Sequence, residues 1–279
     1  MKAIYENELL SKYNWFNLGG AAKIFFKPQS VDELKKFLKD YSKEKYKIHI
    51  LGAGSNTLFR DNGFDGIVIK LGNNFSYTKL LKDNEIEAGA STMDKKISDF
   101  ATEKSLTGFE FLSCIPGSIG GSITMNSGCY GEDISKIFLS LTAINLDGQI
   151  ETFTKDQINF FYRGNNLKSN LIILSAIFKG NVLSKEKILE KQLNLINKKK
   201  ESQPTRVKTC GSTFKNPKNN KKAWELIRAA ECLDLRVGGA SISQKHNNFF
   251  INEGNASALD IENLIEKVKE TVLKKTGIE

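Results

Sequence analysis

The chain has 279 residues, of which 40% are hydrophobic and 26% charged, a composition that excludes an intrinsically disordered protein. Its net charge of +9, from 41 Lys and Arg against 32 Asp and Glu, suits anionic ligands such as nucleotides. The N-terminal segment has no apolar core of a secretory signal, and the longest apolar stretch, near Leu171–Phe178, is far too short to span a membrane. We therefore expect a cytoplasmic protein without membrane insertion.

Two lysine-rich segments, Asn197–Lys200 and Lys221–Lys222, are open to two interpretations. They are either solvated surface or part of a nucleic-acid patch. The sequence holds no concentrated basic tract, so we favour solvated surface and expect no nucleic-acid partner.

The cysteines show no C-x-x-C spacing, and the chain has only two histidines. Neither a zinc site nor a disulfide framework is expected from this pattern at this chain length. The four residues are Cys114, Cys129, Cys210 and Cys232.

The first predicted elements form a compact α/β unit over residues 15–72. A strand at Ala21–Phe26 is followed by a helix that begins after Ser30, where S-V-D-E gives a capping box. A strand at Lys47–Leu51 runs directly into a glycine loop. The turn Asp61–Gly63 precedes a further strand at Gly66–Lys70.

The next predicted elements, within residues 73–180, indicate a mixed sheet with few helices. A helix is expected over Met93–Lys104, opened by Ser91 or Thr92. The dipeptide Asp147-Gly148 predicts a β-hairpin. The expected strands are Glu85–Ala88, Thr142–Asn145, Ile150–Phe153 and Leu171–Phe178.

The last predicted elements indicate a separate α+β domain. Helices are expected over Ser184–Ser202, Ala223–Glu231 and Leu259–Lys275. The apolar face of the first is predicted to consist of Ile188, Leu189, Leu193 and Ile196. Short strands are expected at Leu235–Val237, Ser241–Ser243 and Phe249–Ile251. The predicted domains are 1–72, 73–183 and 184–279.

The glycine loop after the third predicted element reads Gly52-Ala53-Gly54-Ser55-Asn56-Thr57. Successive backbone N–H groups of such a loop can form an anion-binding nest. Thr57 stands where a dinucleotide G-x-G-x-x-G would place glycine, and no P-loop pattern is present. A plain tight turn therefore remains an alternative to a phosphate site.

A second glycine-rich segment, Pro116–Gly131, carries Gly117, Gly120, Gly121, Gly128 and Gly131. Small hydrogen-bonding side chains lie between these glycines. So many permissive positions beside polar groups favour a backbone-lined ligand site over a purely structural loop.

Two later segments combine polar and aromatic residues. Arg163 follows three aromatic residues, Phe160–Tyr162, and is either a surface cation–π partner or a positive charge directed at an anion. Ser212, in the glycine-flanked loop Thr209–Pro217, can be a hydrogen-bond donor, a nucleophile or a proton carrier. It is not part of a G-x-S-x-G nucleophile elbow.

Taken in chain order, these segments resemble the UDP-N-acetylenolpyruvoylglucosamine reductase family. The resemblance is carried by NWFNLGGAAKIFFKP, LGAGSNTLFRDNGFDGIVIKL, GFEFLSCIPGSIGGSITMNSGCYG, FFYRGNNL, CGSTFKNP and RVGGASISQKHNNFFIN. Together they cover nearly the whole chain, with the compact spacing of the shorter subclass. The resemblance implies an α+β fold with a two-part FAD-binding domain of the vanillyl-alcohol-oxidase/PCMH type and a smaller α+β substrate-binding domain.

The resemblance also implies the cofactor and its site. The cofactor is FAD, bound non-covalently, with NADPH as co-substrate. The two glycine loops would enclose the FAD diphosphate. The implied cofactor-binding residues are Gly52, Ala53, Gly54, Ser55, Asn56, Thr57, Pro116, Gly117, Ser118, Gly120, Gly121, Met125, Asn126, Gly128 and Tyr130.

The family mechanism implies two catalytic residues in this chain. NADPH reduces the flavin, which then gives a hydride to C3 of the enolpyruvyl ether of UDP-N-acetylglucosamine. Arg163 would stabilise the resulting enolate and Ser212 would protonate C2, giving UDP-N-acetylmuramate for peptidoglycan synthesis. The implied substrate-binding residues are Tyr162, Lys208, Lys215, Asn216, Lys245, His246 and Asn247. A monomer without metal is expected.

The pattern departs from the family at the C-terminus. The family has a third catalytic residue, a glutamate in an L-E-x-E-[VI] segment, and Glu279 falls a few residues short of it, so Glu279 is not assigned that role. We expect the sequence to belong to a longer protein; the alternative is a protein that lacks this glutamate and is impaired. Another FAD-dependent oxidoreductase of the same fold and a nucleotide- or RNA-binding protein are the competing interpretations.

Overall fold

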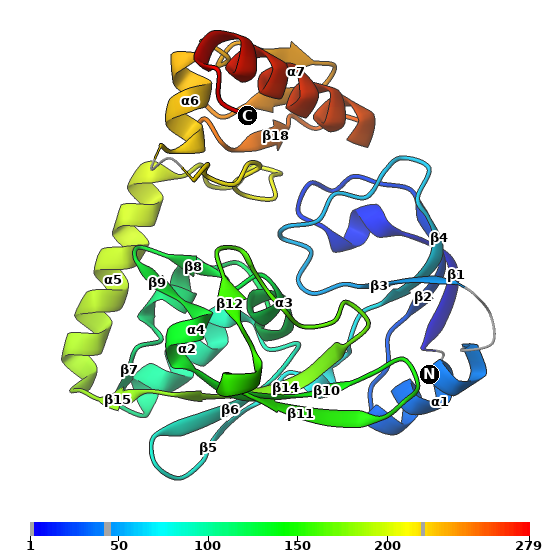
Figure 1. Cartoon of the computed structure of the whole chain (residues 1–279), viewed down its shortest axis with the longest axis vertical. Helices are drawn as coiled ribbons and strands as arrows, with labels where there is room; N and C mark the ends of the chain where they lie inside the picture. Colours follow the sequence, from blue (N-terminus) through cyan, green and yellow to red (C-terminus); the bar gives the residue numbers. More distant parts are fainter. Residues whose placement is uncertain (1–2, 42–45, 219–220) are drawn as a thin grey trace. The chain divides into compact units, whose positions relative to one another are not determined.

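A computed structural model describes residues 3–41, 46–218 and 221–279, which form two compact units (Figure 1). The first unit holds the described residues of Met1–Tyr5, Ile24–Ala53 and Gly66–Lys199. The second holds Glu6–Lys23, Gly54–Asp65 and the described residues of Lys200–Glu279. Within these ranges, every helix is too short or too polar to be a membrane-spanning segment. The division of the sequence at residues 72 and 183 stays a prediction.

The first sheet has four strands in the order β1, β2, β4, β3. Strand β3 pairs in parallel with β4, and helix α1 (Val31–Tyr41) connects β2 to the segment before β3. One half of the predicted capping box is present, because the Glu33 amide donates to Ser30 Oγ at 3.1 Å, while the Glu33 carboxylate accepts the Gln29 amide at 2.6 Å. The bounds are β1 (Ile4–Leu9), β2 (Ala21–Phe26), β4 (Phe64–Ile69) and β3 (Lys47–Ile50), which confirms the three strands predicted there.

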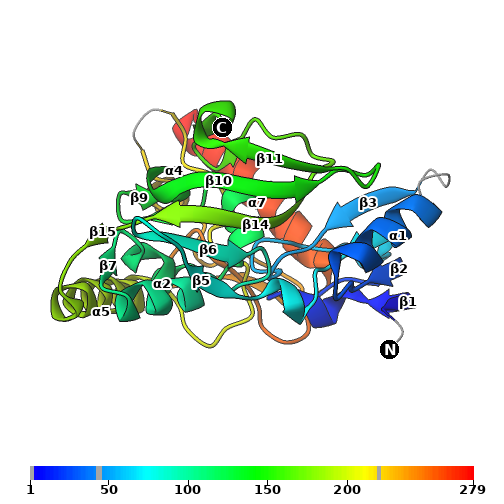
Figure 2. The same ribbon diagram turned by 90° about the horizontal axis from the view of Figure 1, so that it is seen from below.

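The second sheet, in the first unit, has five antiparallel strands in the order β11, β10, β14, β6, β5 (Figure 2). The bounds are β11 (Ile150–Thr154), β10 (Phe138–Ile144), β14 (Ile172–Lys179), β6 (Glu85–Gly89) and β5 (Thr78–Leu80). The predicted hairpin around Asp147-Gly148 joins β10 to β11, with Ile144 opposite Ile150. The strands predicted in this part of the chain are confirmed.

Helix α2 (Asp94–Glu103) begins without the predicted side-chain cap. The N-cap position is Met93, and the two residues expected to cap the helix bind other carbonyls. Ser91 donates to Leu71 O at 3.0 Å, and Thr92 donates to Tyr77 O at 2.8 Å. Both hydroxyls therefore bind backbone carbonyls of residues 71 and 77, not the first amides of α2. The predicted cap was wrong.

Helix α5 (Lys185–Ser202) is confirmed, but its predicted apolar face is wrong. Leu189 and Leu193 are 39% and 56% exposed, whereas Ile188 and Gln192 are buried. The amide of Gln192 donates to Ser98 Oγ at 3.1 Å and to Asp99 Oδ1 at 3.2 Å, both on α2. The partner surface is polar, so hydrophobic periodicity alone could not identify the buried side of α5.

The second unit builds its own core around a three-stranded antiparallel sheet. Strands β16 (Arg236–Val237), β17 (Ala240–Ile242) and β18 (Phe250–Asn252) pair in that order. Helices α6 (Ala223–Ala229) and α7 (Ala258–Thr276) bury their apolar residues in the same cluster as Phe16 and Leu18. The helices and strands predicted for this region are confirmed.

Helix α7 receives its N-terminal cap from a distant turn. Besides the local capping box of Ser257 and Asp260, the Asp61 carboxylate accepts the Ala258 amide at 2.8 Å and the Leu259 amide at 3.0 Å. A carboxylate at this end satisfies two orphan N–H groups and complements the helix dipole. The turn at Asp61 therefore joins the early part of the chain to the second unit's core helix.

Replacing Asp61 by Ala should lower the free energy of unfolding of the second unit by about 1–2 kcal/mol, because two amides lose their acceptor. The matched control is Asp65→Ala, whose carboxylate is exposed and 3.6 Å from Lys23. That control should change stability by less than about 0.5 kcal/mol. The chain's two tryptophans, Trp15 and Trp224, both lie in the second unit, so tryptophan fluorescence during urea unfolding reports on it. Equal midpoints for the two variants would contradict the cap.

Candidate active site

The second glycine loop, Pro116–Gly131, begins between the 3-10 helix η3 (Glu110–Cys114) and helix α3 (Ile119–Thr124) and includes α3. Backbone hydrogen bonds fix it against the segment before α2. Asp94 N donates to Gly117 O at 3.1 Å, and Gly120 N donates to Ala90 O at 2.9 Å. Helix α3 also contacts β6 and β14, so the loop is mounted on the five-stranded sheet.

The buried carboxyl of Asp94 packs against this loop. Its side chain is fully buried, and it accepts the Ser122 hydroxyl at 2.6 Å. Burial raises the pKa of Asp94 to about 7, although hydrogen bonds from Ser122 and the Gly117 backbone act in the opposite direction. Asp94 Oδ1 has no hydrogen-bond partner among the described residues. Both the neutral and the charged form of Asp94 are therefore populated near pH 7.

Glycine is required at residue 117 because of this carboxyl. A Cβ at Gly117 would lie 2.5 Å from Asp94 Oδ2 and 3.0 Å from Ser122 Oγ. The φ angle of Gly117 is not in the left-handed region, so close approach rather than conformation demands glycine here.

The start of the first glycine loop lies against the second one. A Cβ at Gly52 would lie 2.8 Å from Ser118 Oγ and 3.8 Å from the Gly121 backbone. Ser118 is buried, and its hydroxyl has no hydrogen-bond partner among the described residues. The first unit therefore brings Gly52, Ser118 and Gly121 together around an unsatisfied hydroxyl.

A lysine that the sequence analysis missed lies at the same place. Lys70, just after β4, donates its ammonium group to the carbonyl of Gly52. Burial, with a smaller contribution from Lys27, lowers the pKa of Lys70 to about 8. As the last residue of a predicted strand, Lys70 gave no signal in the sequence, because its role depends on the pairing of β3 with β4.

The rest of the first loop, Gly54–Thr57, belongs to the second unit. Gly54 has φ +72°, and any Cβ there would overlap the carbonyl of Tyr13. The Gly54 carbonyl accepts Trp15 N at 3.1 Å, and Cys210 Sγ donates to Thr57 O at 3.3 Å. Ser55 is half-buried and Asn56 is exposed. The tight turn considered from the sequence is present at this position.

The predicted cofactor residues that follow α3 differ in their surroundings. Met125 is the C-cap of α3, and Tyr130 is 42% exposed. Asn126 is buried, accepts the Ser135 amide at 3.1 Å and donates to Phe161 O at 3.2 Å. Asn126 thus holds the chain around it, a structural use that the sequence analysis did not foresee.

Arg163 lies at the turn of a small hairpin, β12 (Phe160–Phe161) and β13 (Gly164–Asn165). It has φ +61°, a backbone conformation that is strained for a residue other than glycine. The guanidinium donates to Gly128 O at 3.0 Å and lies 5.1 Å from the Tyr162 ring centroid. The aromatic contact predicted as one alternative for Arg163 is therefore present, together with a hydrogen bond to a backbone carbonyl. The other alternative, a charge directed at an anion, stays a prediction.

The hairpin that carries Arg163 is fastened to α3. Asn165 Nδ2 donates to Ile123 O at 2.8 Å and to Thr124 O at 3.3 Å, which satisfies carbonyls at the end of the helix. Asn126, directly after α3, holds Phe161 in the opposite strand of the hairpin. Helix α3 therefore connects the second glycine loop at its start to Arg163 at its end.

Ser212 belongs to a loop of the second unit. It forms a β-bridge with Phe249, and the next two amides bind Asn248, Thr213 N to its carbonyl at 2.8 Å and Phe214 N to its side chain at 2.9 Å. Gly211 has φ +79°, and Ser212 itself is exposed. This pairing brings Ser212 beside the segment Lys245–Asn248, which the sequence also indicated as polar and functional.

The predicted substrate residues differ in their exposure. Lys208, Lys215 and Lys245 are exposed, as is Tyr162 in the first unit. Asn216 Oδ1 accepts the first amide of α6 at 3.0 Å, and buried Asn247 donates to Ser243 O at 3.3 Å.

The ring of His246 lies 4.6 Å from that of Phe249, measured between centroids. Burial lowers the pKa of His246, so it is neutral at pH 7. The neutral ring can accept a hydrogen bond at Nδ1, and the Asn248 amide donates to that nitrogen at 3.3 Å.

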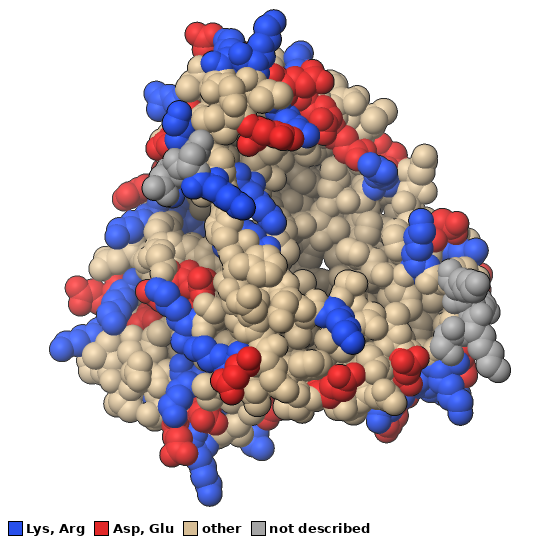
Figure 3. Space-filling model, viewed as in Figure 1, with Lys and Arg blue, Asp and Glu red and all other residues tan. Residues whose placement is uncertain are grey.

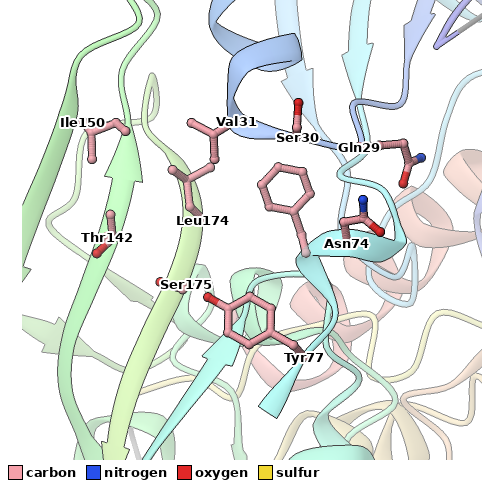
Figure 4. A pocket seen from close by; sticks show the side chains of 10 residues that line it. Gln29, Ser30, Val31, Asn74, Tyr77, Thr142, Ile150, Leu174 and Ser175 are labelled. Atoms are coloured by element: carbon pink, nitrogen blue, oxygen red, sulfur yellow. The ribbon is translucent and has the colours of Figure 1, made fainter. Parts of the chain in front are cut away.

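A cavity of about 320 Å³ in the first unit contains none of these residues (Figure 4). It is lined by the start of α1, by Asn74 and Phe75, and by β10, β11 and β14. Tyr77, whose hydroxyl is directed toward Ser175 in Figure 4, hydrogen-bonds to Glu87 at 2.9 Å. Because no predicted site residue lines this cavity, the candidate site remains at the glycine loops.

Comparison with known proteins identifies the family. The FAD binding domain family matches residues 22–154, and the C-terminal domain of UDP-N-acetylenolpyruvoylglucosamine reductase matches residues 203–279. The reductase of Pelagibacter ubique is 51% identical over 271 residues, covering 96% of this chain and 89% of the relative. The chain belongs to the UDP-N-acetylenolpyruvoylglucosamine reductase family. It is therefore a flavoprotein oxidoreductase of peptidoglycan-precursor synthesis that uses FAD and NADPH.

Solved structures agree with this family and fold. The UDP-N-acetylenolpyruvylglucosamine reductase of Thermus caldophilus superposes with a TM-score of 0.86 at 30% identity, covering 98% of this chain and 96% of that one. A glucose dehydrogenase, Phl p 4.0202, gives a TM-score of 0.50 at 10% identity over 66% of this chain and 42% of its own. The second match concerns the fold alone. The predicted α+β fold with an FAD-binding domain is confirmed.

The residues at the glycine loops fit FAD, which carries a diphosphate. The unsatisfied Ser118 hydroxyl is available as a donor, and the glycines leave open the space that a Cβ at Gly52 would fill. Lys70 supplies a cation at the same position. Where a diphosphate site lacks the dinucleotide G-x-G-x-x-G motif, the expected donors are backbone amides, a hydroxyl and an ammonium group.

FAD affinity should fall as the pH rises above about 7, and Asp94→Asn should remove most of this decline. Asp94 is neutral below its pKa of about 7 and negative above it. A bound diphosphate disfavours the negative form of Asp94. At higher pH, FAD binding is therefore accompanied by protonation of Asp94. We expect the wild-type dissociation constant to increase at least about fivefold between roughly pH 6 and pH 8, as measured by flavin fluorescence.

The control for this experiment is Asp99→Asn on the same helix, where the exposed carboxylate pairs with Lys95 at 2.5 Å. It should keep the wild-type pH dependence. A smaller decline near pH 8 should persist in Asp94→Asn, because Lys70 loses its charge there. Identical pH profiles for the wild type and Asp94→Asn would assign the effect to another group.

Proposed function

We propose that Arg163 is the residue of this chain that binds the enolpyruvyl carboxylate and stabilises the charge that develops there. The observation that carries this proposal is the attachment of the Arg163 hairpin to α3, the helix that begins at the second glycine loop. A guanidinium is permanently charged and can bind a carboxylate through two parallel N–H groups. The guanidinium has five N–H donors. The hydrogen bond to Gly128 O uses one of them, which leaves four for the substrate.

We propose that Ser212 delivers the proton that completes the reduction. Bound FAD supplies the hydride that NADPH provides, and a proton must then reach C2 of the substrate. Ser212 is exposed on a loop that is fixed by its bridge to Phe249 and by the Asn248 hydrogen bonds to the following residues. A hydroxyl held this way can donate without a rearrangement of its loop.

Ser118, Lys70 and the loop amides other than those of Ile119 and Gly120, which bind Thr92 O and Ala90 O, are proposed to hold the FAD diphosphate in the first unit. Asp94 keeps the loop in place through Ser122 without facing the diphosphate as a fixed negative charge. The exposed cations Lys208, Lys215 and Lys245 of the second unit suit the diphosphate of a UDP-sugar. The division of the chain into domains 1–72, 73–183 and 184–279 belongs to the same proposal.

The charge distribution supports a small anionic substrate rather than nucleic acid. On the face seen in Figure 3, Lys and Arg side chains are interspersed with Asp and Glu side chains. Part of the positive charge on the described residues is also paired, as in Lys95–Asp99 and Lys275–Glu231. We propose that the protein acts in the cytoplasm as a monomer.

Arg163→Ala should lower kcat about 10²–10³-fold while FAD remains bound, because a charge-stabilising group is lost. Arg163→Lys should recover only a small part of this loss, since an ammonium group cannot bind a carboxylate through two parallel bonds. Steady-state NADPH oxidation and the flavin absorbance of the purified variants are the two measurements. Loss of bound FAD in both variants would place Arg163 at the cofactor instead.

Ser212→Ala should leave reduction of the enzyme by NADPH unchanged and slow its reoxidation by substrate about 10²–10⁴-fold. A stopped-flow record of flavin absorbance separates the two half-reactions. Thr213→Ala, a change of the neighbouring hydroxyl, is the matched control and should leave both half-reactions near wild type. Reoxidation of Ser212→Ala at the normal rate would refute the proton-donor role.

A further inference from the structure

A buried asparagine of the second unit, Asn248, pairs with the loop that carries Ser212. Asn248 is 3% exposed, and both polar atoms of its side chain bind the backbone of Phe214. Phe214 N donates to Asn248 Oδ1 at 2.9 Å, and Asn248 Nδ2 donates to Phe214 O at 2.8 Å. The carboxamide therefore makes the pair of hydrogen bonds that a neighbouring antiparallel strand would make, and its two partners fix which atom is oxygen and which is nitrogen.

The backbone of Asn248 adds two further hydrogen bonds. Its carbonyl accepts Thr213 N at 2.8 Å, and its amide donates to His246 Nδ1 at 3.3 Å. The next residue, Phe249, forms the bridge with Ser212. All four polar groups of Asn248 are thus engaged, and three of them hold the two residues that directly follow Ser212.

The Ser212 loop is held from one side. A Cβ at Gly211 would meet no atom within 4 Å, and Ser212 is exposed. On the other side, the Phe214 ring contacts that of buried Phe250, with 5.9 Å between the two centroids. A ring contact leaves the backbone free to tilt, whereas hydrogen bonds to both the N–H and the C=O of one residue are directional and fix its peptide groups. The Asn248 carboxamide is therefore a direct constraint on the backbone that follows Ser212.

We propose that Asn248 is a positioning residue for proton transfer to the substrate: its carboxamide holds the Phe214 backbone and thereby sets the position of the Ser212 hydroxyl. The inference rests on the proposed role of Ser212 as proton donor. Proton transfer needs a donor within about 2.6–3.2 Å of its acceptor, and a displacement of about 1 Å slows a reaction on the order of 10²-fold. All four polar groups of Asn248 are used within the protein, so it acts through Ser212 and not by touching the substrate.

Asn248→Ala removes only the two hydrogen bonds to Phe214, because the backbone groups that bind Thr213 and His246 stay. We expect the FAD-loaded variant to be reduced by NADPH at the wild-type rate, and its reoxidation by saturating substrate to be slowed about 10–100-fold. The dissociation constant of the substrate should stay within about twofold, since His246, a predicted substrate residue, keeps its contact. Stopped-flow flavin absorbance measures all three quantities. Reoxidation at the normal rate, in an enzyme that Ser212→Ala slows, would overturn the inference.

The matched control is Asn252→Ala, a change of a second buried asparagine in the same unit. Asn252 is 5% exposed, its Nδ2 donates to Phe16 O at 2.8 Å, and its Oδ1 accepts Gly254 N at 2.8 Å. These partners lie outside the Ser212 loop, so the variant should lose stability at least as much as Asn248→Ala but keep both half-reactions near wild type. Reoxidation slowed in both variants in proportion to their loss of stability would assign the effect to general loss of structure and overturn the positioning role.

Asn248→Asp tests the hydrogen bond itself, and it serves the same purpose if Asn248→Ala does not fold. A carboxylate keeps the acceptor for Phe214 N but opposes Phe214 O, whereas a protonated carboxyl donates to that carbonyl as the amide does. Burial raises the pKa of a carboxyl, so the reoxidation rate should recover at least about fivefold between roughly pH 8 and pH 5, where the protonated form appears. Rates are expressed relative to the wild type at each pH, which removes the titration of His246. A ratio that does not change with pH would contradict the role of this hydrogen bond.

A double variant, Ser212→Ala with Asn248→Ala, tests whether Asn248 acts through Ser212. Reoxidation of the double variant should be no slower than that of Ser212→Ala alone, because the hydroxyl that Asn248 positions is already gone. A further slowing as large as the one that Asn248→Ala causes in the wild type would show that Asn248 acts by another route and overturn the inference. Normal reoxidation of Ser212→Ala would instead refute the proposed proton donor, so the single and double variants distinguish the two failures.

Discussion

The hydrogen bond between Ser122 and the buried carboxyl of Asp94 is the interaction on which the candidate site depends. It joins α2 to α3 beneath the second glycine loop, and it leaves no room for a side chain at Gly117. Helix α3 then positions the hairpin of Arg163 through Asn165. Loop, helix and hairpin are thus joined by a continuous series of hydrogen bonds.

The glycines at this site are required chiefly by close approach, not by unusual dihedral angles. Gly52, Gly117 and Gly120 keep φ outside the left-handed region, yet a Cβ on any of them would meet a neighbour at 3.2 Å or less. This explains why the spacing matches neither the dinucleotide motif nor the P-loop. Those motifs form a turn at the start of one helix, whereas here two separate segments pack backbone against side chain.

Sequence patterns predicted most strands of the two main sheets, the hairpin at Asp147-Gly148 and the longer helices, because each depends on local periodicity or turn chemistry, but they did not predict β1, β5 or α3. The missed features depend on tertiary contacts. Asp94 looked like an ordinary acidic residue at a helix start, and only its burial beneath Gly117 gives it a role. The buried face of α5 was mistaken because Gln192 binds polar groups of α2. The roles of Arg163 and Ser212 came from family resemblance, since no local pattern specifies them.

Burial acts on the two ionisable groups at the glycine loops in a way that favours an incoming anion. It raises the pKa of Asp94 toward 7 and lowers that of Lys70 toward 8, so each group is moved toward its neutral form. A diphosphate reverses only the second effect, because it stabilises the lysine cation and further destabilises the carboxylate. At the proposed diphosphate site, an incoming anion would therefore meet an acid that need not carry charge and a base that it keeps charged.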